Sequence, residues 1–77
     1  MKNSAMKTNK IIASVVSEDS DGIGVEIYLE DRLLLDIFRD DTKKTRTVTF
    51  YSKDIPLEIL EDSIEFFNKE IPTKFIE

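Results

Sequence analysis

The spacing of apolar side chains changes once along this chain, near Asp54. Between residues 23 and 52, apolar side chains recur at every second position, which is the repeat of a β-strand with one buried face. Between residues 56 and 71 they recur at intervals of three and four, which is the repeat of an α-helix that buries one stripe. The pattern predicts an antiparallel sheet followed by one packed helix.

Turn signals divide the sheet region into four predicted strands. Asp21-Gly22 favours a tight hairpin after a first short strand at residues 11–17, whose facing stays open because both of its sides are apolar. The polar segment 41–44 separates the third predicted strand from a fourth, which is rich in Thr, Val and aromatic residues. Short connections between successive strands predict an antiparallel meander.

The connection between the second and third predicted strands decides which side chains share a face. A three-residue loop at residues 30–32 sets Ile27 opposite Leu35 and keeps the apolar side chains on one face. A two-residue turn would place Ile27 opposite Asp36. We therefore predict the three-residue loop, which leaves Leu34 on the other face.

Two prolines bound the predicted helix. Pro56 suits the first turn, where a backbone N–H is not needed, and Pro72 ends the helix. The apolar stripe consists of Leu57, Ile59, Leu60, Ile64, Phe66, Phe67 and Ile71. We predict a single α+β domain at residues 10–77 with the order ββββα, a four-stranded antiparallel β-meander with one C-terminal α-helix packed on one face, and a flexible N-terminal segment at residues 1–9.

The inner face of this sheet is expected to supply the core. Because a chain of 77 residues buries a small core, each large inner side chain matters. We expect truncation of Leu35, Phe50, Leu60 or Phe67 to unfold the domain.

The chain contains no cysteine and no histidine, which excludes several chemistries. Thiolate nucleophiles, imidazole acids and bases, and the usual zinc ligands are absent. The acidic turn at residues 17–22 lacks a carboxylate at the first and twelfth positions of a calcium loop, so we interpret it as a solvated turn. Glu26 and Asp36 are predicted to face each other on the exposed sheet face, where we expect them to rotate apart or meet Arg39. We therefore predict no catalytic residue, no metal and no cofactor.

Charge and hydropathy restrict the partners and the location. The net charge is −5, and because residues 1–10 hold three lysines and no acid, the body of the chain is more acidic still. An acidic body disfavours nonspecific binding to nucleic acid phosphates. The apolar run at residues 11–16 is too short for the hydrophobic region of a secretory signal peptide, which has roughly 7–15 residues. It is also too short for a membrane-spanning helix, which needs ~20 residues. We expect no membrane association and a cytoplasmic location.

The sheet face opposite the helix is the main functional candidate. One helix covers one face only, so the apolar side chains predicted on the other face lack an internal partner. These side chains are Tyr28, Leu34, Phe38 and Tyr51. We predict a non-enzymatic protein-interaction domain that forms a homodimer or binds another protein through this face. The acidic helix, with Glu58, Glu61, Asp62, Glu65 and Glu70, makes an inhibitor, antitoxin or immunity-like protein one version of this hypothesis.

A nucleic-acid-binding module is the alternative hypothesis. Lys43, Lys44 and Arg46 form the only basic cluster in the predicted body, at the tip of a hairpin. Basic groups beside an aromatic side chain such as Tyr51 are how single strands are held.

Overall fold

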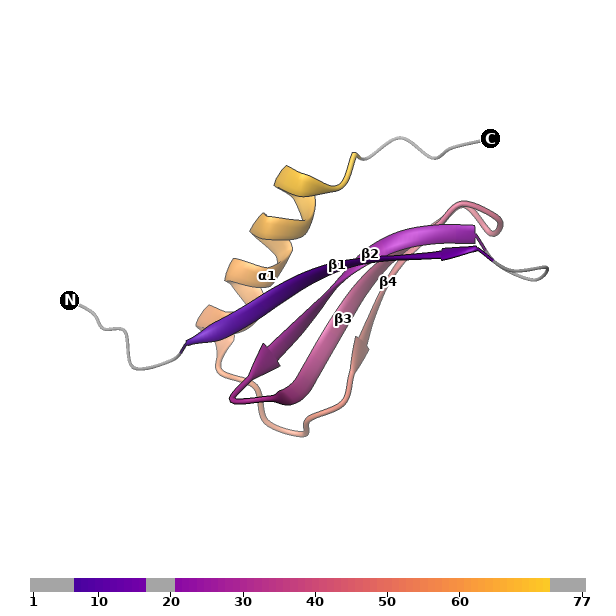
Figure 1. Cartoon of the computed structure of the whole chain (residues 1–77). Coiled ribbons are helices and arrows are strands. Elements are labelled where there is room, and N and C mark those ends of the chain that lie inside the picture. The colour runs from indigo at the N-terminus through magenta and orange to yellow at the C-terminus, as the bar shows by residue number, and fades with distance from the viewer. Residues whose placement is uncertain (1–6, 17–20, 73–77) are drawn as a thin grey trace.

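The computed structural model describes residues 7–16 and 21–72 as a four-stranded antiparallel sheet followed by one α-helix. The strands lie in chain order across the sheet, so the predicted meander and the ββββα order are confirmed (Figure 1). The elements are β1 (Thr8–Val16), β2 (Asp21–Leu29), β3 (Arg32–Asp40), β4 (Thr45–Phe50) and α1 (Leu57–Glu70). Within the described residues, no helix is long and apolar enough to span a membrane.

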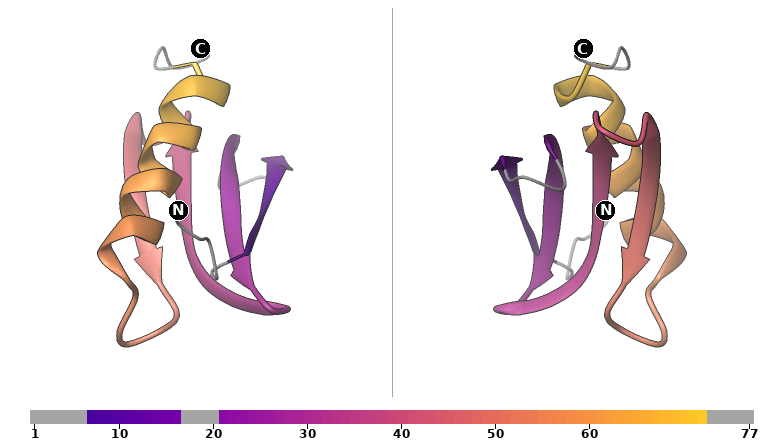
Figure 2. Two further views of the ribbon diagram at one scale, coloured as in Figure 1. Left: turned by 90° about the vertical axis from the view of Figure 1, so that its left-hand side faces the viewer. Right: turned by 90° about the vertical axis from the view of Figure 1, so that its right-hand side faces the viewer.

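Helix α1 lies across one face of the sheet and leaves the other face open (Figure 2). It packs against β2 and β3, and the core forms between these three elements. The buried apolar side chains are Val25, Ile27, Leu34, Leu35, Ile37, Ile59, Phe67 and Ile71. We call the face under α1 the inner face and the opposite one the outer face.

The ends of α1 follow the expected proline signals. Pro56 precedes the helix, and its carbonyl oxygen accepts the N–H of Ile59 at 3.0 Å. Ile71 leaves the helical conformation just before Pro72 while its N–H still donates to the carbonyl of Phe67. Because proline has no N–H to continue the hydrogen-bond series, the helix ends there.

Strand β1 begins at Thr8, so two residues of the segment expected to be flexible pair with β2. Lys10 of β1 reaches across the inner face to α1. Its Nζ atom lies 2.8 Å from Asp62 Oδ2 and 5.8 Å from the centre of the Phe66 ring. This contact fixes which residues of β1 face inward, a question that the sequence left open.

The β2–β3 hairpin differs from the predicted three-residue loop. Leu29 pairs with Arg32, so the turn contains only Glu30 and Asp31. Both have positive φ, at 51° and 70°, as a type I′ turn requires. This turn is favoured because its twist matches that of the two strands, even though neither residue is the glycine or asparagine usually found there.

A β-bulge in β3 restores the predicted register beyond the turn. Ile27 pairs with Leu35 as expected, while Tyr28 pairs with Leu33, so Leu34 is the extra residue. Leu34 is 2% exposed and belongs to the core. The prediction that Leu34 lies on the outer face is therefore wrong, because the bulge turns two consecutive side chains inward.

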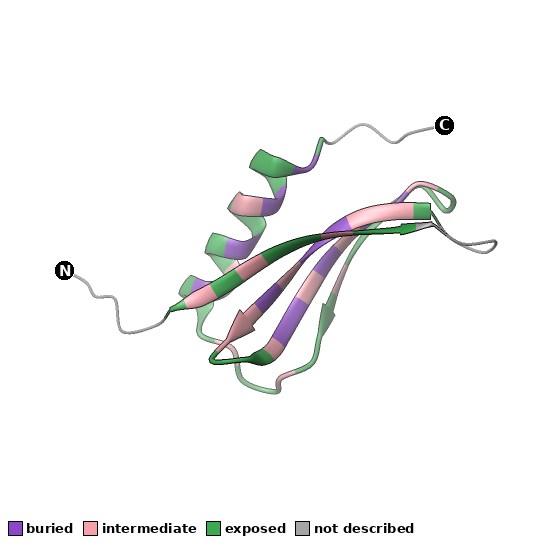
Figure 3. Cartoon of the chain, in the orientation of Figure 1, coloured by how far each residue is buried: buried purple, intermediate pink, exposed green. Residues whose placement is uncertain are grey.

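Strand β4 has the predicted register but not the predicted burial. Leu35 pairs with Phe50, yet Phe50 is 55% exposed. Leu57 and Ile64 of α1 are exposed as well, whereas burial concentrates on β2, β3 and one side of the helix (Figure 3). The expectation that Phe50 is a central core residue is wrong, because α1 packs over β2 and β3 and leaves the inner face of β4 partly open.

Candidate functional site

The outer face carries a row of four polar and aromatic side chains across β2, β3 and the residue after β4. Glu26 and Asp36 are cross-strand partners, as predicted. The Tyr28 hydroxyl donates to Glu26 Oε1 at 3.0 Å, and the Tyr51 hydroxyl donates to Asp36 Oδ2 at 2.7 Å. We call Tyr28, Glu26, Asp36 and Tyr51 the tyrosine–carboxylate row.

The two carboxylates of this row face each other without a cation. Ion pairs within residues 7–16 and 21–72 include Lys10–Asp62 and Arg39–Asp41, and neither Glu26 nor Asp36 pairs with a lysine or arginine of these ranges. Two like charges directly opposite each other in an antiparallel sheet are unfavourable. The row is therefore a site where a positive charge from outside would be stabilised.

The row also changes the acidity of its tyrosines. The hydrogen bond to Glu26, then burial, then the charge of Glu26 raise the pKa of Tyr28 above its ordinary value of 10.0. For Tyr51, the hydrogen bond to Asp36 is the main cause of a raised pKa, followed by burial and by the charges of Asp36 and Glu26. Both phenols therefore stay protonated at neutral pH and keep donating to the carboxylates.

Phe38, the third predicted aromatic of this face, lies over the two glycines of β2. A methyl group at Gly24 would lie 3.1 Å from Phe38 Cδ1 and would meet the carbonyl oxygen of Ile37. A methyl group at Gly22 would lie 2.8 Å from Phe38 Cε2. The ring thus fills the space that side chains at these glycines would take, which leaves it half-buried rather than fully available to a partner.

Beside this ring, the outer face is hollowed. A small cavity of about 120 Å³ lies between β1 and β3, lined by Ala13, Val15 and Phe38 and bordered by Glu26 and Asp36. One end of the cavity is apolar and the other is acidic.

Two apolar residues of β1 extend the outer face and were missed by the sequence reasoning. Ile11 pairs with Glu26 and Val15 pairs with Gly22, and both apolar side chains are exposed. The predicted tight hairpin at Asp21-Gly22 is wrong, because both residues belong to β2 and pair with Val16 and Val15. Its register would nevertheless have placed odd-numbered residues of β1 on the outer face.

The structure separates the residues of the nucleic-acid alternative. Lys43 and Lys44 lie in the β3–β4 turn, and Arg46 lies on the inner face as the partner of Arg39. Tyr51 lies at the other end of β4, on the outer face, with its hydroxyl bonded to Asp36. Tyr51 is therefore not brought together with the basic cluster, although Lys43 lines a hollow of the outer face with Phe38, Asp36 and Asp40.

Arg39 does not approach the outer carboxylates. It is buried on the inner face, where its side chain contacts Asp41 and the carbonyl oxygen of Pro72. The expectation that it meets Glu26 and Asp36 is wrong, because β3 turns alternate side chains to opposite faces.

Residues 7–16 and 21–72 contain no group of three acidic residues close enough to hold a metal ion. Most of the acidic turn at residues 17–22 lies outside the described residues.

Comparison of the chain with protein-family models, with curated proteins and with solved structures finds no match.

Proposed function

We propose that this chain is a non-enzymatic interaction domain that binds a basic surface of another protein through the outer face. The observation that carries the proposal is the tyrosine–carboxylate row, in which Glu26 and Asp36 face each other without a cation among the described residues. An arginine or lysine side chain of the partner would neutralise the pair. We place this activity in the cytoplasm, as the short apolar run leads us to expect.

The chemistry of the row suits a guanidinium or ammonium group. Each carboxylate accepts one hydrogen bond from a tyrosine and keeps further acceptor sites open. Hydrogen bonds between a charged donor and a carboxylate are about twice as strong as neutral ones. The adjoining cavity offers apolar walls, at Ala13 and Val15, for the aliphatic part of such a side chain.

A second copy of this chain is a poorer occupant of the outer face. Stacking two outer faces would bring two Glu26–Asp36 pairs together and add like charges to a pair that already repels. We therefore favour a different, basic protein over the homodimer expected from the sequence. An inhibitor, antitoxin or immunity-like role is one form of this proposal, in which the outer face and not the exposed Glu58, Glu61 and Glu65 of α1 would meet the basic partner.

Site-specific photo-crosslinking tests the proposal. A benzophenone amino acid replaces Tyr51 on the outer face or, as a control, Glu65 on the exposed side of α1, and crosslinking is carried out in the cells that make the protein. We expect a basic partner to be captured from position 51 and not from position 65. Capture from position 65 alone, or from neither position, would contradict the proposal.

The captured partner is then purified and titrated by calorimetry. The double variant Glu26→Gln and Asp36→Asn keeps hydrogen-bond acceptors for both tyrosines but removes the two charges. We expect it to weaken binding at least tenfold, about 1.4 kcal/mol by the usual conversion. The matched control, Glu61→Gln with Glu65→Gln, removes the same charge from α1 and should change affinity far less. Equal effects of the two variants would show that net charge, and not the row, drives binding.

A further inference from the structure

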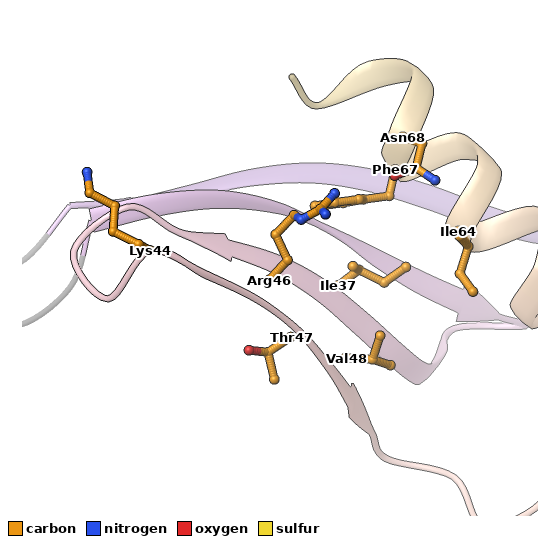
Figure 4. A pocket seen from close by; sticks show the side chains of 8 residues that line it. All are labelled: Ile37, Lys44, Arg46, Thr47, Val48, Ile64, Phe67 and Asn68. Atoms are coloured by element: carbon orange, nitrogen blue, oxygen red, sulfur yellow. The ribbon is translucent and has the colours of Figure 1, made fainter. Parts of the chain in front are cut away.

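An open groove runs between β4 and α1 on the inner face. Its volume is about 600 Å³, with Ile37 and Val48 on the floor and Ile64 and Phe67 on the helix wall. Figure 4 shows Val48 and Arg46 extending from β4 on the helix side of the sheet, whereas Thr47 extends to the other side. The groove exists because α1 packs over β2 and β3 and not over β4.

The outer edge of β4 presents backbone groups that face away from the sheet. β4 is the last strand in the sheet order. The N–H of Tyr51 donates to the carbonyl of Leu34 at 2.8 Å, which directs the odd-numbered residues of this strand toward β3. The N–H and C=O groups of Arg46, Val48 and Phe50 therefore point to the open edge. An added strand would pair with these three residues, and the side chains of Arg46 and Val48 also border the groove.

The charge along this edge differs from that of the rest of the chain. The strand Thr45–Phe50 has no acidic residue, although the whole chain carries a net charge of −5. Arg46 is exposed and forms no ion pair with any described residue. A ligand that places a carboxylate opposite Arg46 would gain a charge-assisted hydrogen bond beside an apolar groove.

We propose that β4 and α1 bind an extended acidic peptide segment of another protein as a fifth, antiparallel strand. Because even-numbered residues of β4 face the edge, alternate ligand residues pair with Phe50, Val48 and Arg46 in that order. Ligand side chains opposite Phe50 and Val48 are apolar, and the one opposite Val48 lies along the groove toward Ile64. The side chain opposite Arg46 is acidic. The recognised pattern is therefore apolar, any residue, apolar, any residue, acidic.

A second copy of β4 matches this edge less well. In the symmetric pairing that sets Val48 opposite itself, Arg46 lies opposite Phe50 and receives no carboxylate. Shifting the pairing to set Arg46 opposite itself brings two guanidinium groups together, which is unfavourable. Either dimer also joins two acidic bodies, whereas an acidic strand neutralises Arg46.

The test uses a fluorescein-labelled peptide of sequence SVTITES, in which V, I and E take the positions opposite Phe50, Val48 and Arg46. We expect saturable binding by fluorescence anisotropy, at least tenfold weaker for SVTITKS. Reversal of the charge on the protein, Arg46→Glu, should invert this preference. Arg32→Glu, a matched reversal at an exposed position in the β2–β3 hairpin, should leave it unchanged. Circular dichroism of both variants checks that they fold.

Backbone methylation separates strand addition from simple charge attraction. N-methylation of the I residue blocks an N–H that faces β4, whereas N-methylation of the neighbouring T residues blocks groups that face away. We expect at least a tenfold loss in the first case and less than a threefold loss in the second. Equal effects at both positions, or equal binding of the two peptides by the unmodified protein, would overturn the proposal.

Sedimentation and the outer-face variant complete the test. A dimer at micromolar concentration that dissociates on Val48→Pro, which removes an N–H that faces the open edge, would assign the edge to a second copy and overturn the peptide proposal. The Glu26→Gln, Asp36→Asn variant should bind SVTITES as the unmodified protein does. If the outer face binds no basic partner, the proposal for the groove still stands. If the groove binds no acidic peptide, the proposal for the outer face still stands.

Discussion

Arg39 and Asp41 form a nearly buried ion pair at the end of β3, and Arg39 also joins the sheet to the chain after α1. Arg39 Nε lies 3.0 Å from Asp41 Oδ1, and Nη2 donates to Oδ2 at 3.2 Å. The two side chains are 3% and 10% exposed. Arg39 Nη1 also donates to the carbonyl oxygen of Pro72 at 2.7 Å. Arg39 therefore holds the chain after α1 against the inner face.

Removing one partner of this pair should destabilise the domain severely. Arg39→Ala removes the buried guanidinium that contacts Asp41 and the carbonyl oxygen of Pro72, and breaking such a buried pair costs about 3–5 kcal/mol. Arg32→Ala, at an exposed arginine, should change the free energy of unfolding by no more than about 0.5 kcal/mol. Urea unfolding followed by circular dichroism measures both. A loss below about 1 kcal/mol for Arg39→Ala would mean that water reaches Asp41 readily.

Truncation of Leu34 should destabilise the domain more than truncation of Phe50. The alternation of apolar residues alone implies the reverse, because it places Phe50 in the core and Leu34 on the outer face. Leu34 is fully buried by the bulge, so Leu34→Ala should cost about 2–5 kcal/mol. Phe50 lies half in solvent on the edge strand, so Phe50→Ala should cost well under the ~3–5 kcal/mol of a buried phenylalanine. Chemical denaturation of the two variants decides. A larger loss for Phe50→Ala would place the helix over β4.

These two residues show how far the sequence reaches. Alternation fixed the element order and the Ile27–Leu35 register, because a one-residue slip would expose every core side chain. It did not reveal the bulge, which depends on the twist of a two-residue turn and not on hydrophobicity. The sequence pattern also did not reveal where α1 crosses the sheet. The apolar stripe of a helix indicates which side of the helix is buried but not which strands the helix covers. The outer face was predicted correctly at Tyr28 and Tyr51, whereas its extension to Ile11 was missed.

Substitution of Glu30 and Asp31 in the β2–β3 turn should stabilise the domain. Both residues have positive φ, a conformation that costs roughly 1 kcal/mol for residues with a β-carbon and little for glycine. Replacing them with Asn and Gly, the favoured pair for this turn, should raise the free energy of unfolding by about 1 kcal/mol. Thermal unfolding reports the gain. Lys44→Gly, at the other non-glycine position with positive φ, should act in the same direction, whereas Asp54→Gly should not.

Gly24 should tolerate no side chain. Its added β-carbon would meet the carbonyl oxygen of Ile37 on the neighbouring strand as well as the Phe38 ring. Because backbone on a central strand cannot move as a flexible side chain does, Gly24→Ala should cost about 1–3 kcal/mol. Adding Phe38→Ala should not restore stability, since the Ile37 contact remains. Equilibrium unfolding of the single and double variants tests this, and recovery in the double variant would identify the ring as the obstacle.

The two tyrosines should report on the carboxylates that hold them. Both have a pKa raised above 10.0, so the stabilisation that each gives is complete below pH 10 and is lost as the pH rises through the folded-state pKa. The chain has two tyrosines, so Tyr28→Phe and Tyr51→Phe each leave one phenol, whose ionisation is followed by absorbance at 295 nm.

Asp36→Asn should lower the pKa of Tyr51 toward its ordinary value and leave Tyr28 unchanged, because the Tyr51 hydroxyl donates to Asp36 and the Tyr28 hydroxyl to Glu26. Glu26→Gln should act mainly on Tyr28 and slightly on Tyr51, since the charge of Glu26 also contributes to the pKa of Tyr51. Equal shifts of both tyrosine pKa values after either substitution would mean that the overall negative charge, and not these two hydrogen bonds, raises the pKa values. A bound cation between the carboxylates should lower both values together, because it offsets the negative charge that raises them.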